Sequence, residues 1–257
     1  MSAQVVLLGH RIGYSASPPI QNAAFRALDL DWSYALHDVP PDLLPEAVAE
    51  LRRPGRNGAN VTTPHKMAVA ELVDLLDPVA ERLAAVNTIV CDGERLIGHN
   101  TDLPALAAEL SDLVGASPGH AVVLGTGGAS RAAQAALADA KSAAVTLVTR
   151  ERWGELPALL ADAALLVNAT PIGTASDETP VPAELLRSDL TVLDLVYRPS
   201  PTRLVREARA AGALARDGAG MLLRQAAASF ELWTGRPAPF EVMRAALQAE
   251  LRTAVHV

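Results

Sequence analysis

The 257-residue sequence has little of several residue types, and each shortage excludes a class of protein. Cys91 is the single cysteine, so no disulfide can form within the chain. No apolar run approaches the roughly 18 residues of a membrane-spanning helix. The N-terminal segment MSAQVVLLGHRIG also lacks the charged segment and the long apolar segment of a signal peptide. We therefore expect a cytoplasmic protein.

Basic residues are few and scattered. The net charge is −7, and no basic run is present, either alone or interleaved with aromatic residues. Nucleic acid and anionic membrane are therefore poor partners, and a small soluble ligand is expected. His10, His65 and His99 have no metal-ligand spacing among them, so no metal site is expected. Half of the residues are apolar, which is enough for the cores of two modest domains or of one large α/β domain.

Lysine is especially rare, because arginine supplies nearly all of the positive charge and only two lysines occur. One of them, Lys66, stands in the stretch NVTTPHKMA, just after a Thr-Thr-Pro turn and at the start of an apolar helix. Arginine does not deprotonate in proteins, whereas a lysine amine can exchange a proton. The sequence therefore indicates Lys66 as a candidate for proton transfer.

Short apolar runs alternate with longer segments of helical periodicity, which predicts an α/β fold with a parallel sheet between helices. In the first part of the chain we predict strands at 4–9, 32–39 and 58–62, and helices at 18–28, 41–52, from Lys66 onward and at 78–85. Asp92-Gly93 stands between two apolar runs and predicts a β-hairpin. We expect this hairpin to form the edge of the sheet.

The chain changes character after Asp102, where a helix and the turn-rich segment GASPGH precede a new strand. We place a domain boundary here, with the second domain at residues 104–221. The last two predicted helices, 221–234 and 239–251, are long enough to return to the first domain. The first domain is therefore expected to contain residues 1–103 and 222–257.

The second domain begins with a glycine-rich turn in HAVVLGTGGASRAA. Gly125 and Gly127 occupy the first two positions of a G-x-G-x-x-G pattern, and Ser130 occupies the third. Small residues there let the backbone approach a pyrophosphate, whose charge is stabilised by the helix N-terminus. An ordinary tight turn is the alternative, but a strand before the turn and a helix after it favour a dinucleotide site.

The end of the next strand, VTLVTRER, distinguishes between the nicotinamide cofactors. An NAD site usually has Asp or Glu at this place, whereas Thr149 and Arg150 suit a 2′-phosphate. NADP is therefore favoured. Two alternatives stay open: Arg150 and Arg152 could serve only as solvated residues at a helix start, and Glu151 could bind the ribose 2′-hydroxyl of NAD.

Eight short blocks, SASP, GANVTTPHK, AVNT, GHNTD, LGTGGASR, VNATPIG, DLVY and GMLLRQAA, follow one another along the chain. In this order they resemble the shikimate dehydrogenase family over nearly the whole length. The resemblance implies a substrate-binding domain followed by a Rossmann-like dinucleotide-binding domain. It also implies reversible NADPH-dependent reduction of 3-dehydroshikimate to shikimate, a step of chorismate and aromatic amino acid biosynthesis, by a monomer or homodimer.

The resemblance also implies roles for matching residues. Lys66 and Asp102 resemble the catalytic pair. A positioned ammonium can stabilise the charge that develops on a reduced ketone oxygen and can donate the proton, while the carboxylate orients it. The implied substrate-binding residues are Ser15, Ser17, Thr62, Asn87, Tyr197 and Gln225. The expected cofactor-binding residues are Gly125, Gly127, Gly128, Ala129, Ser130, Thr149, Arg150, Arg152, Thr170, Val196, Gly218 and Met221.

Three departures from the family pattern are visible, and one of them is that the family's usual Asn-Arg-Thr after the second strand of the cofactor domain is here Thr149, Arg150 and Glu151. In GHRIGYS, Arg11 and Tyr14 stand where the family usually has a proline and a histidine, near the carboxylate end of the substrate. In addition, only 18 residues separate Thr149 from Asn168, about half of the family's usual spacing. This segment has room for one short helix, so we predict a trimmed sheet of order 2-1-4-5-6 without the third strand.

Other interpretations remain open at the level of the sequence. A quinate or aminoshikimate dehydrogenase that uses NAD, a methylenetetrahydrofolate dehydrogenase, and a catalytically degenerate nucleotide-binding relative are the alternative functions. Individual residues also have structural alternatives. The SASP segment could be only a helix N-cap, Asn87 could be a turn residue, and Gln225 could be a hydrogen-bonded core amide.

Overall fold

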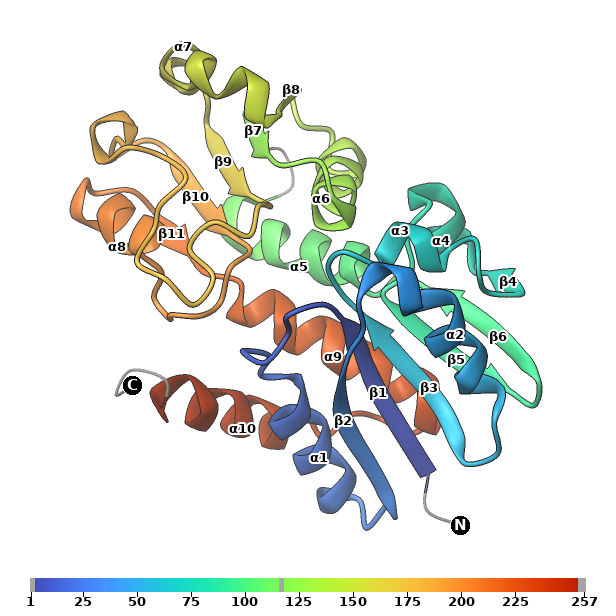
Figure 1. Ribbon diagram of the computed structural model, residues 1–257. Coiled ribbons are helices and arrows are strands. Elements are labelled where there is room, and N and C mark those ends of the chain that lie inside the picture. The colour runs from blue at the N-terminus through green and yellow to red at the C-terminus, as the bar shows by residue number, and fades with distance from the viewer. Residues whose placement is uncertain (1–2, 116–117, 254–257) are drawn as a thin grey trace. The chain divides into compact units, whose positions relative to one another are not determined.

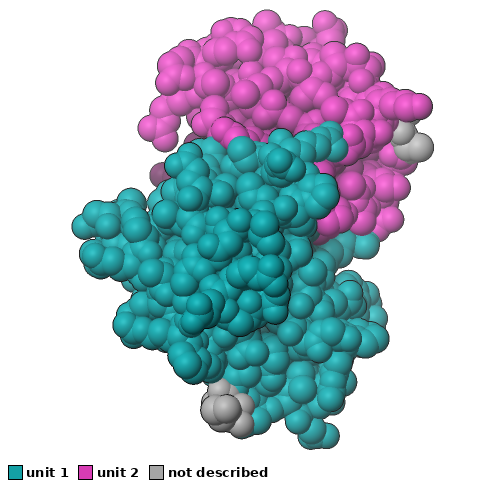
Figure 2. Space-filling view, turned by 90° about the vertical axis from the view of Figure 1, so that its right-hand side faces the viewer, with its two compact units in different colours: residues 1–102, 223–253 teal, residues 103–222, 254–257 magenta. Residues whose placement is uncertain are grey.

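The computed structural model describes residues 3–115 and 118–253, which form two compact units. Unit 1 contains the chain up to Asp102 together with residues 223–253, and unit 2 contains residues 103–222 (Figure 2). The chain therefore leaves unit 1 at the start of one helix, α5 (Asp102–Val114), and returns to it within another, α9 (Ala219–Thr234).

Unit 1 is built on a mixed six-stranded sheet of order β2-β1-β3-β5-β6-β4 (Figure 1). Its strands are β1 (Ala3–Gly9), β2 (Trp32–Asp38), β3 (Arg56–Val61), β4 (Leu75–Leu76), β5 (Thr88–Asp92) and β6 (Arg95–His99). β1 pairs in parallel with β2 and β3, as the alternation of strands and helices predicts, and β5 is antiparallel to β3. β1 is buried along almost its whole length, as expected for a strand covered on both faces of the sheet.

The predicted β-hairpin is present as β5 and β6, but the prediction that it forms the sheet edge is wrong. Asp92 lies opposite Arg95, so the loop residues are Gly93 and Glu94, and Gly93 has the positive φ of 63° that this tight turn requires. The edge on the side of the hairpin is β4, which pairs with β6, and the opposite edge is β2. A strand of two residues is too short to show periodicity in the sequence.

The helices of unit 1 cover the sheet and complete its core. They are α1 (Ser17–Ala27), α2 (Leu44–Ala49) between the 3-10 turns Pro41–Leu43 and Glu50–Arg52, α3 (Lys66–Val69), α4 (Pro78–Leu83), the larger part of α9, and α10 (Phe240–Thr253). Leu44 and Val48 of α2 belong to one buried cluster with Leu8 of β1. α1 packs against α10 (Figure 1). Phe25 of α1 contacts Phe230 of α9, with ring centroids 5.5 Å apart.

Unit 2 contains a fully parallel sheet of order β11-β10-β9-β7-β8. Its strands are β7 (His120–Leu124), β8 (Ala144–Val148), β9 (Leu165–Asn168), β10 (Thr191–Asp194) and β11 (Ala215–Arg216). Counted from the first strand of a Rossmann unit, this is the predicted order 2-1-4-5-6, so the trimmed sheet is confirmed. Between β8 and β9 the chain forms only a 3-10 segment (Arg150–Glu155) and α7 (Leu156–Ala161).

The remaining helices of unit 2 are α5, α6 (Gly128–Asp139), α8 (Arg203–Ala210) and the short 3-10 turn Ala183–Leu185. One buried cluster joins the sheet to α7 and α8, with Val122 of β7 and Val192 of β10 packed with Leu160 and Val205. Among the helices that the structure describes, none has the length and apolar character to cross a membrane.

Candidate active site

Lys66 is held at the start of α3 by contacts on both sides. His65 is buried, and its ring Nε2 hydrogen-bonds to the Val39 carbonyl oxygen at 2.7 Å. The Lys66 carbonyl oxygen accepts from the backbone N–H of Val86 at 2.8 Å. Because His65 and the carbonyl group of Lys66 are both held in this way, the direction in which the lysine side chain leaves the backbone is restricted.

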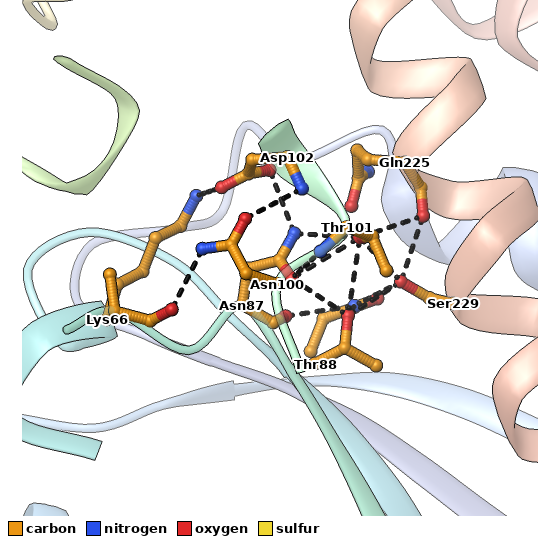
Figure 3. Close-up of polar contacts among 10 residues, drawn as sticks. Lys66, Asn87, Thr88, Asn100, Thr101, Asp102, Gln225 and Ser229 are labelled. Carbon is orange, nitrogen blue, oxygen red and sulfur yellow. Dashed lines mark hydrogen bonds and ion pairs between the residues drawn. The ribbon is translucent and has the colours of Figure 1, made fainter. Parts of the chain in front are cut away.

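The structure brings the two predicted catalytic residues together (Figure 3). Lys66 Nζ lies 2.6 Å from Asp102 Oδ2, and the side chains are 17% and 4% exposed respectively. The low exposure means that water screens this ion pair weakly. Because Lys66 is the more exposed of the two residues, a reacting molecule would approach the pair at the lysine side chain.

Asp102 is fixed in turn by the asparagines of the AVNT and GHNTD blocks. Its backbone N–H donates to Asn100 Oδ1 at 3.1 Å, and its Oδ1 accepts from Asn87 Nδ2 at 2.8 Å. The two carboxylate oxygens therefore have different partners, an amide on one side and an ammonium on the other. Such charge-assisted hydrogen bonds define the orientation of the carboxylate.

The other predicted substrate-binding residues come from several elements. The hydroxyl oxygen of Ser15 accepts from the backbone N–H of Ser17 at 3.2 Å. A bond of this kind at the helix start is what the N-cap alternative for the SASP segment predicts, although the N-cap residue of α1 is Ala16. Ser17 is buried at the first position of α1. Thr62 is half-buried directly after β3, and Gln225 is half-buried on α9, in the same unit. Tyr197 belongs to unit 2, where it follows β10.

The departing segment GHRIGYS is attached to the end of β2. Arg11 has a φ of 58°, and its backbone N–H donates to both carboxylate oxygens of Asp38 at 3.0 and 3.1 Å. This backbone hydrogen bond, followed by the one from the His10 ring, holds the pKa of Asp38 below its ordinary value. Burial raises the pKa of the half-buried Tyr14. At Arg11, where the family usually has a proline, the loop is thus held by the carboxylate of Asp38.

The glycine-rich turn of unit 2 has the geometry of an anion site. Gly125 has a φ of 105°, and a Cβ there would lie 2.9 Å from the Ala169 carbonyl oxygen, so this place requires glycine. A Cβ on Gly127 would meet nothing within 4 Å, and no side chain caps the helix that begins at Gly128. The first N–H groups of a helix have no partner within it, so they remain available to a phosphate.

The place of this turn in the sheet supports the same interpretation. β7 lies between β8 and β9, so the chain reverses its direction of progress across the sheet at this point, which is where ligands bind in open α/β sheets. Ala129 and Ser130 continue the first turn of α6, and Ser130 is fully buried, which explains the need for a small residue at the third position.

The three charged residues that follow β8, Arg150, Glu151 and Arg152, differ in their bonding partners. Thr149 donates to Glu151 Oε2 at 2.5 Å, and this hydrogen bond lowers the pKa of the Glu151 carboxyl. Arg152 is bound to Glu155 at 2.7 Å and to the Leu147 carbonyl oxygen at 2.8 Å. Arg150 is exposed and forms no hydrogen bond or ion pair with the residues that the structure describes. Of the two arginines, Arg150 is therefore the one available to a ligand.

Three of the predicted cofactor-binding residues are held by a buried pair that the sequence alone did not indicate. Asn168 and Asp194 lie opposite each other at the ends of β9 and β10, with Asn168 Nδ2 2.8 Å from Asp194 Oδ1. Asn168 Oδ1 accepts from the backbone N–H and the hydroxyl of Thr170, at 3.0 and 2.6 Å. Asp194 accepts from the N–H of Val196, whose carbonyl oxygen accepts from Gly218. Both residues stand in quoted blocks, VNATPIG and DLVY, so their position at the strand ends was the available signal.

The last predicted cofactor residue, Met221, is buried in the first turn of α9. Gly218 precedes it, and a Cβ there would lie 2.2 Å from the Leu195 carbonyl oxygen. This close approach holds the start of α9 against the segment that follows β10. In the part of the chain that the structure describes, no group of three or more His, Cys, Asp or Glu side chains is arranged to hold a metal ion.

We expect Asp194 to make the stability of unit 2 depend on pH. Burial raises its pKa from 3.8 to about 6, although three hydrogen bonds favour the carboxylate. Between these values the folded protein keeps a proton that the unfolded chain has lost, so this contribution is present below about pH 4 and is lost as the pH rises through 6. Because one pKa unit corresponds to about 1.4 kcal/mol, the change is about 3 kcal/mol.

Urea denaturation of the wild type and of Asp194→Asn at pH 4 and pH 7 measures this contribution. The free energy of unfolding of the wild type, relative to the variant, should be larger at pH 4 than at pH 7. Asp189→Asn is the control, because that side chain is 75% exposed. An equal difference at both pH values would show that Asp194 ionises normally.

These features define a class of protein. A parallel sheet with a glycine turn at its switch point, in a chain whose other unit carries a partly buried amine paired with a buried carboxylate, is typical of a nicotinamide-dependent oxidoreductase of two α/β domains.

Comparisons with known proteins identify the family. Residues 7–89 match the family model described as the shikimate dehydrogenase substrate binding domain, and residues 218–248 match that of the shikimate 5′-dehydrogenase C-terminal domain. Shikimate dehydrogenase (NADP(+)) of Natronomonas pharaonis is 43% identical over 95% of this chain and 98% of its own, and that of Symbiobacterium thermophilum is 41% identical over 95% and 93%. Among solved structures, this chain is similar to shikimate 5-dehydrogenase of Thermus thermophilus in complex with NADP(H) and shikimate, with a TM-score of 0.84 and 37% sequence identity. The match covers 97% of this chain and 100% of the Thermus thermophilus chain. The chain belongs to the shikimate dehydrogenase family.

Proposed function

We propose that this protein catalyses the reversible, NADPH-dependent reduction of 3-dehydroshikimate to shikimate, a step of chorismate and aromatic amino acid biosynthesis. The observation that carries the proposal is the Lys66–Asp102 pair, with Nζ and Oδ2 2.6 Å apart, in a chain of this family. NADP, when bound, supplies or accepts the hydride.

Lys66 would act on the oxygen of the reacting carbon. Reduction of a ketone places negative charge on that oxygen. The ammonium stabilises this charge and delivers a proton to the oxygen. In the reverse direction the neutral amine accepts the proton of the shikimate hydroxyl. Asp102 orients the amine throughout and can accept a hydrogen bond from a neighbouring ring hydroxyl.

The remaining substrate residues have chemistry that suits the parts of shikimate. Ser15 and Ser17 would bind the carboxylate through their hydroxyls. The other predicted residues, Thr62, Asn87, Tyr197 and Gln225, would bind ring hydroxyls and the ring edge, since each carries a hydroxyl or an amide.

The residues of unit 2 fit NADP. The open face at Gly127 and the uncapped start of α6 suit a pyrophosphate, bound by the backbone of Gly128 and Ala129. Thr149 and Arg150 suit the 2′-phosphate, and Arg152 supports the segment through its bond to Leu147. The segments that carry Thr170, Val196, Gly218 and Met221 would bind the rest of the cofactor.

A direct assay tests this function. The purified protein should reduce NADP⁺, followed at 340 nm, with shikimate as the substrate, and should do so much faster than with quinate or with NAD⁺. Faster reaction with quinate would reassign the substrate and leave the enzyme class intact. Absence of reaction with every pair would favour a nucleotide-binding relative without catalysis.

Replacing Arg150 with alanine should raise the KM for NADP⁺ by about 10-fold or more and change the KM for NAD⁺ little, because a charge-assisted bond to the 2′-phosphate is lost. Arg53→Ala is the matched control, since Arg53 is an exposed arginine of unit 1 that pairs only with Glu50 among the described residues. Equal losses for both cofactors would show that Arg150 does not bind the 2′-phosphate.

The proposal also includes the cellular location and the oligomeric state. We place the enzyme in the cytoplasm, as a monomer or homodimer. Light scattering coupled to size-exclusion chromatography measures the oligomeric state, and cell fractionation measures the location.

A further inference from the structure

Four buried polar side chains lie on the inner side of the catalytic pair in unit 1 and have no role in the proposed reaction so far. They are Asn60 of β3, Thr88 of β5, Thr101 immediately before α5, and Ser229 of α9. None of these residues is more than 5% exposed. We call them the hydroxyl cluster (Figure 3 labels all but Asn60). Burying polar groups costs stability unless they are hydrogen-bonded, and apolar residues would fill the same space without that cost.

The hydroxyl cluster is closely bonded within itself. Thr88 Oγ1 lies 2.8 Å from Ser229 Oγ, and Asn60 Nδ2 lies 3.1 and 3.0 Å from these two oxygens. The phenol of Tyr34 donates to Asn60 Oδ1 at 2.8 Å, which turns the NH₂ group of Asn60 toward the hydroxyls. The orientation of Asn60 is thus set by a donor that lies outside the cluster.

The side-chain amide of Asn87 has one favoured orientation, and hydroxyls of the cluster bond to both of its ends in that orientation. The backbone N–H of Thr101 lies 2.8 Å from Asn87 Oδ1 and can only donate, so the atom that it meets must be the amide oxygen. The Thr88 hydroxyl, 3.1 Å from the same oxygen, can donate to it as well. Asn87 Nδ2 then faces Thr101 Oγ1 at 2.9 Å and Asp102 Oδ1 at 2.8 Å.

The reverse orientation of Asn87 would be unfavourable on both sides. Its amide oxygen would face the carboxylate of Asp102, and its NH₂ group would face the N–H of Thr101. With the observed orientation, Asp102 Oδ1 is occupied and Oδ2 is directed to Lys66. The orientation of one amide is therefore transmitted to the catalytic amine.

The hydroxyl cluster also holds the turn of α9 that carries Gln225. The hydroxyls of Ser229 and Thr101 lie 2.9 and 3.2 Å from the Gln225 carbonyl oxygen. A predicted substrate residue and the catalytic pair thus share the same buried support.

We propose that Thr88, Thr101 and Ser229 are positioning residues that hold Asn87 in the orientation that directs Asp102 to Lys66. The hydroxyls of Thr88 and Thr101 contact Asn87 directly, and the hydroxyl of Ser229 acts through these two hydroxyls. The proposal deepens the proposed function and rests on it. None of these hydroxyls touches the reacting atoms in this arrangement. Their removal should therefore lower kcat more than it changes KM, because the orientation of the amine matters most in the transition state.

Thr88 offers a matched pair of variants. Thr88→Val removes the hydroxyl and keeps the shape, and it should lower kcat about 10-fold with KM for shikimate changed less than about threefold, as expected for loss of one buried hydrogen bond. Thr88→Ser keeps the hydroxyl and should restore most of kcat. Ser229→Ala should resemble Thr88→Val. Thr146→Val, in which a half-buried strand hydroxyl of unit 2 is lost, is the control and should keep wild-type kcat.

The readouts separate positioning from stability and from the proposed function. Equal losses of kcat in Thr88→Val and Thr88→Ser, or wild-type kcat per folded molecule in Thr88→Val and Ser229→Ala, would overturn the proposal. The side-chain ¹⁵N–¹H resonances of Asn87 report its orientation without turnover, and they should shift or broaden in Thr88→Val but not in Thr146→Val. If the wild-type protein does not oxidise shikimate, the proposed function fails, while unchanged Asn87 resonances in Thr88→Val would overturn the positioning role independently.

Discussion

Replacing Lys66 with alanine is expected to lower kcat by about 10²–10⁴-fold and to leave the KM for shikimate within a few-fold of the wild type. The amine stabilises charge that exists only once the hydride has begun to move, so its loss is felt in the transition state rather than in substrate binding. Steady-state rates at 340 nm in both directions measure the effect.

Two further lysine variants make this result specific. Lys66→Arg keeps a positive charge but cannot exchange the proton, so it should remain far below the wild type. Lys141→Ala removes the other lysine of the chain, which is exposed in unit 2, and should have normal kinetics. Turnover of Lys66→Ala at the wild-type rate would refute the role of this residue.

Replacing Asp102 with asparagine is expected to give the second largest effect, a fall in kcat of about 10²-fold together with a higher KM for shikimate. The carboxylate is 4% exposed and receives both the Lys66 ammonium and the Asn87 amide. A neutral amide would leave a partly buried ammonium without its counter-charge and would place an NH₂ group near one of these donors. The KM rises because the same carboxylate is proposed to bind a ring hydroxyl.

The matched control is Asp92→Asn, which changes an aspartate that is 59% exposed and paired with Arg95 at the β5–β6 turn. Thermal unfolding of both variants distinguishes lost catalysis from lost folding. If Asp102→Asn kept the kcat of the wild type, the ion pair would be structural only, and the proposed mechanism would have to do without the carboxylate.

Spacing along the chain was sufficient to predict features that depend on neighbouring residues. The 18 residues between Thr149 and Asn168 can form one short helical segment, and the sheet indeed lacks the strand that a longer segment would supply. The glycine turn was equally predictable, because Gly125 and Gly127 follow one strand and precede one helix. Lys66 was indicated by its rarity and by its place after a turn.

Features that depend on pairing between distant segments were not predictable in this way. β4 has two residues and becomes a strand only because β6 offers it an edge. Asp38 holds the unusual loop at Arg11 because β1 and β2 end side by side. Asn168 and Asp194 are partners because the registers of β9 and β10 place them opposite each other.

The sequence by itself determined the α/β class, the trimmed order of the second sheet, the glycine turn and the identity of the candidate acid–base amine. All of these follow from residue type and short-range spacing, which limit what the backbone can do locally. Only the tertiary structure decided which partners each polar side chain has. Asn60, Thr88, Thr101 and Ser229 meet because β3 pairs with β5, β5 with β6, and α9 packs against them, and hydrogen bonds over about 3 Å depend on that register.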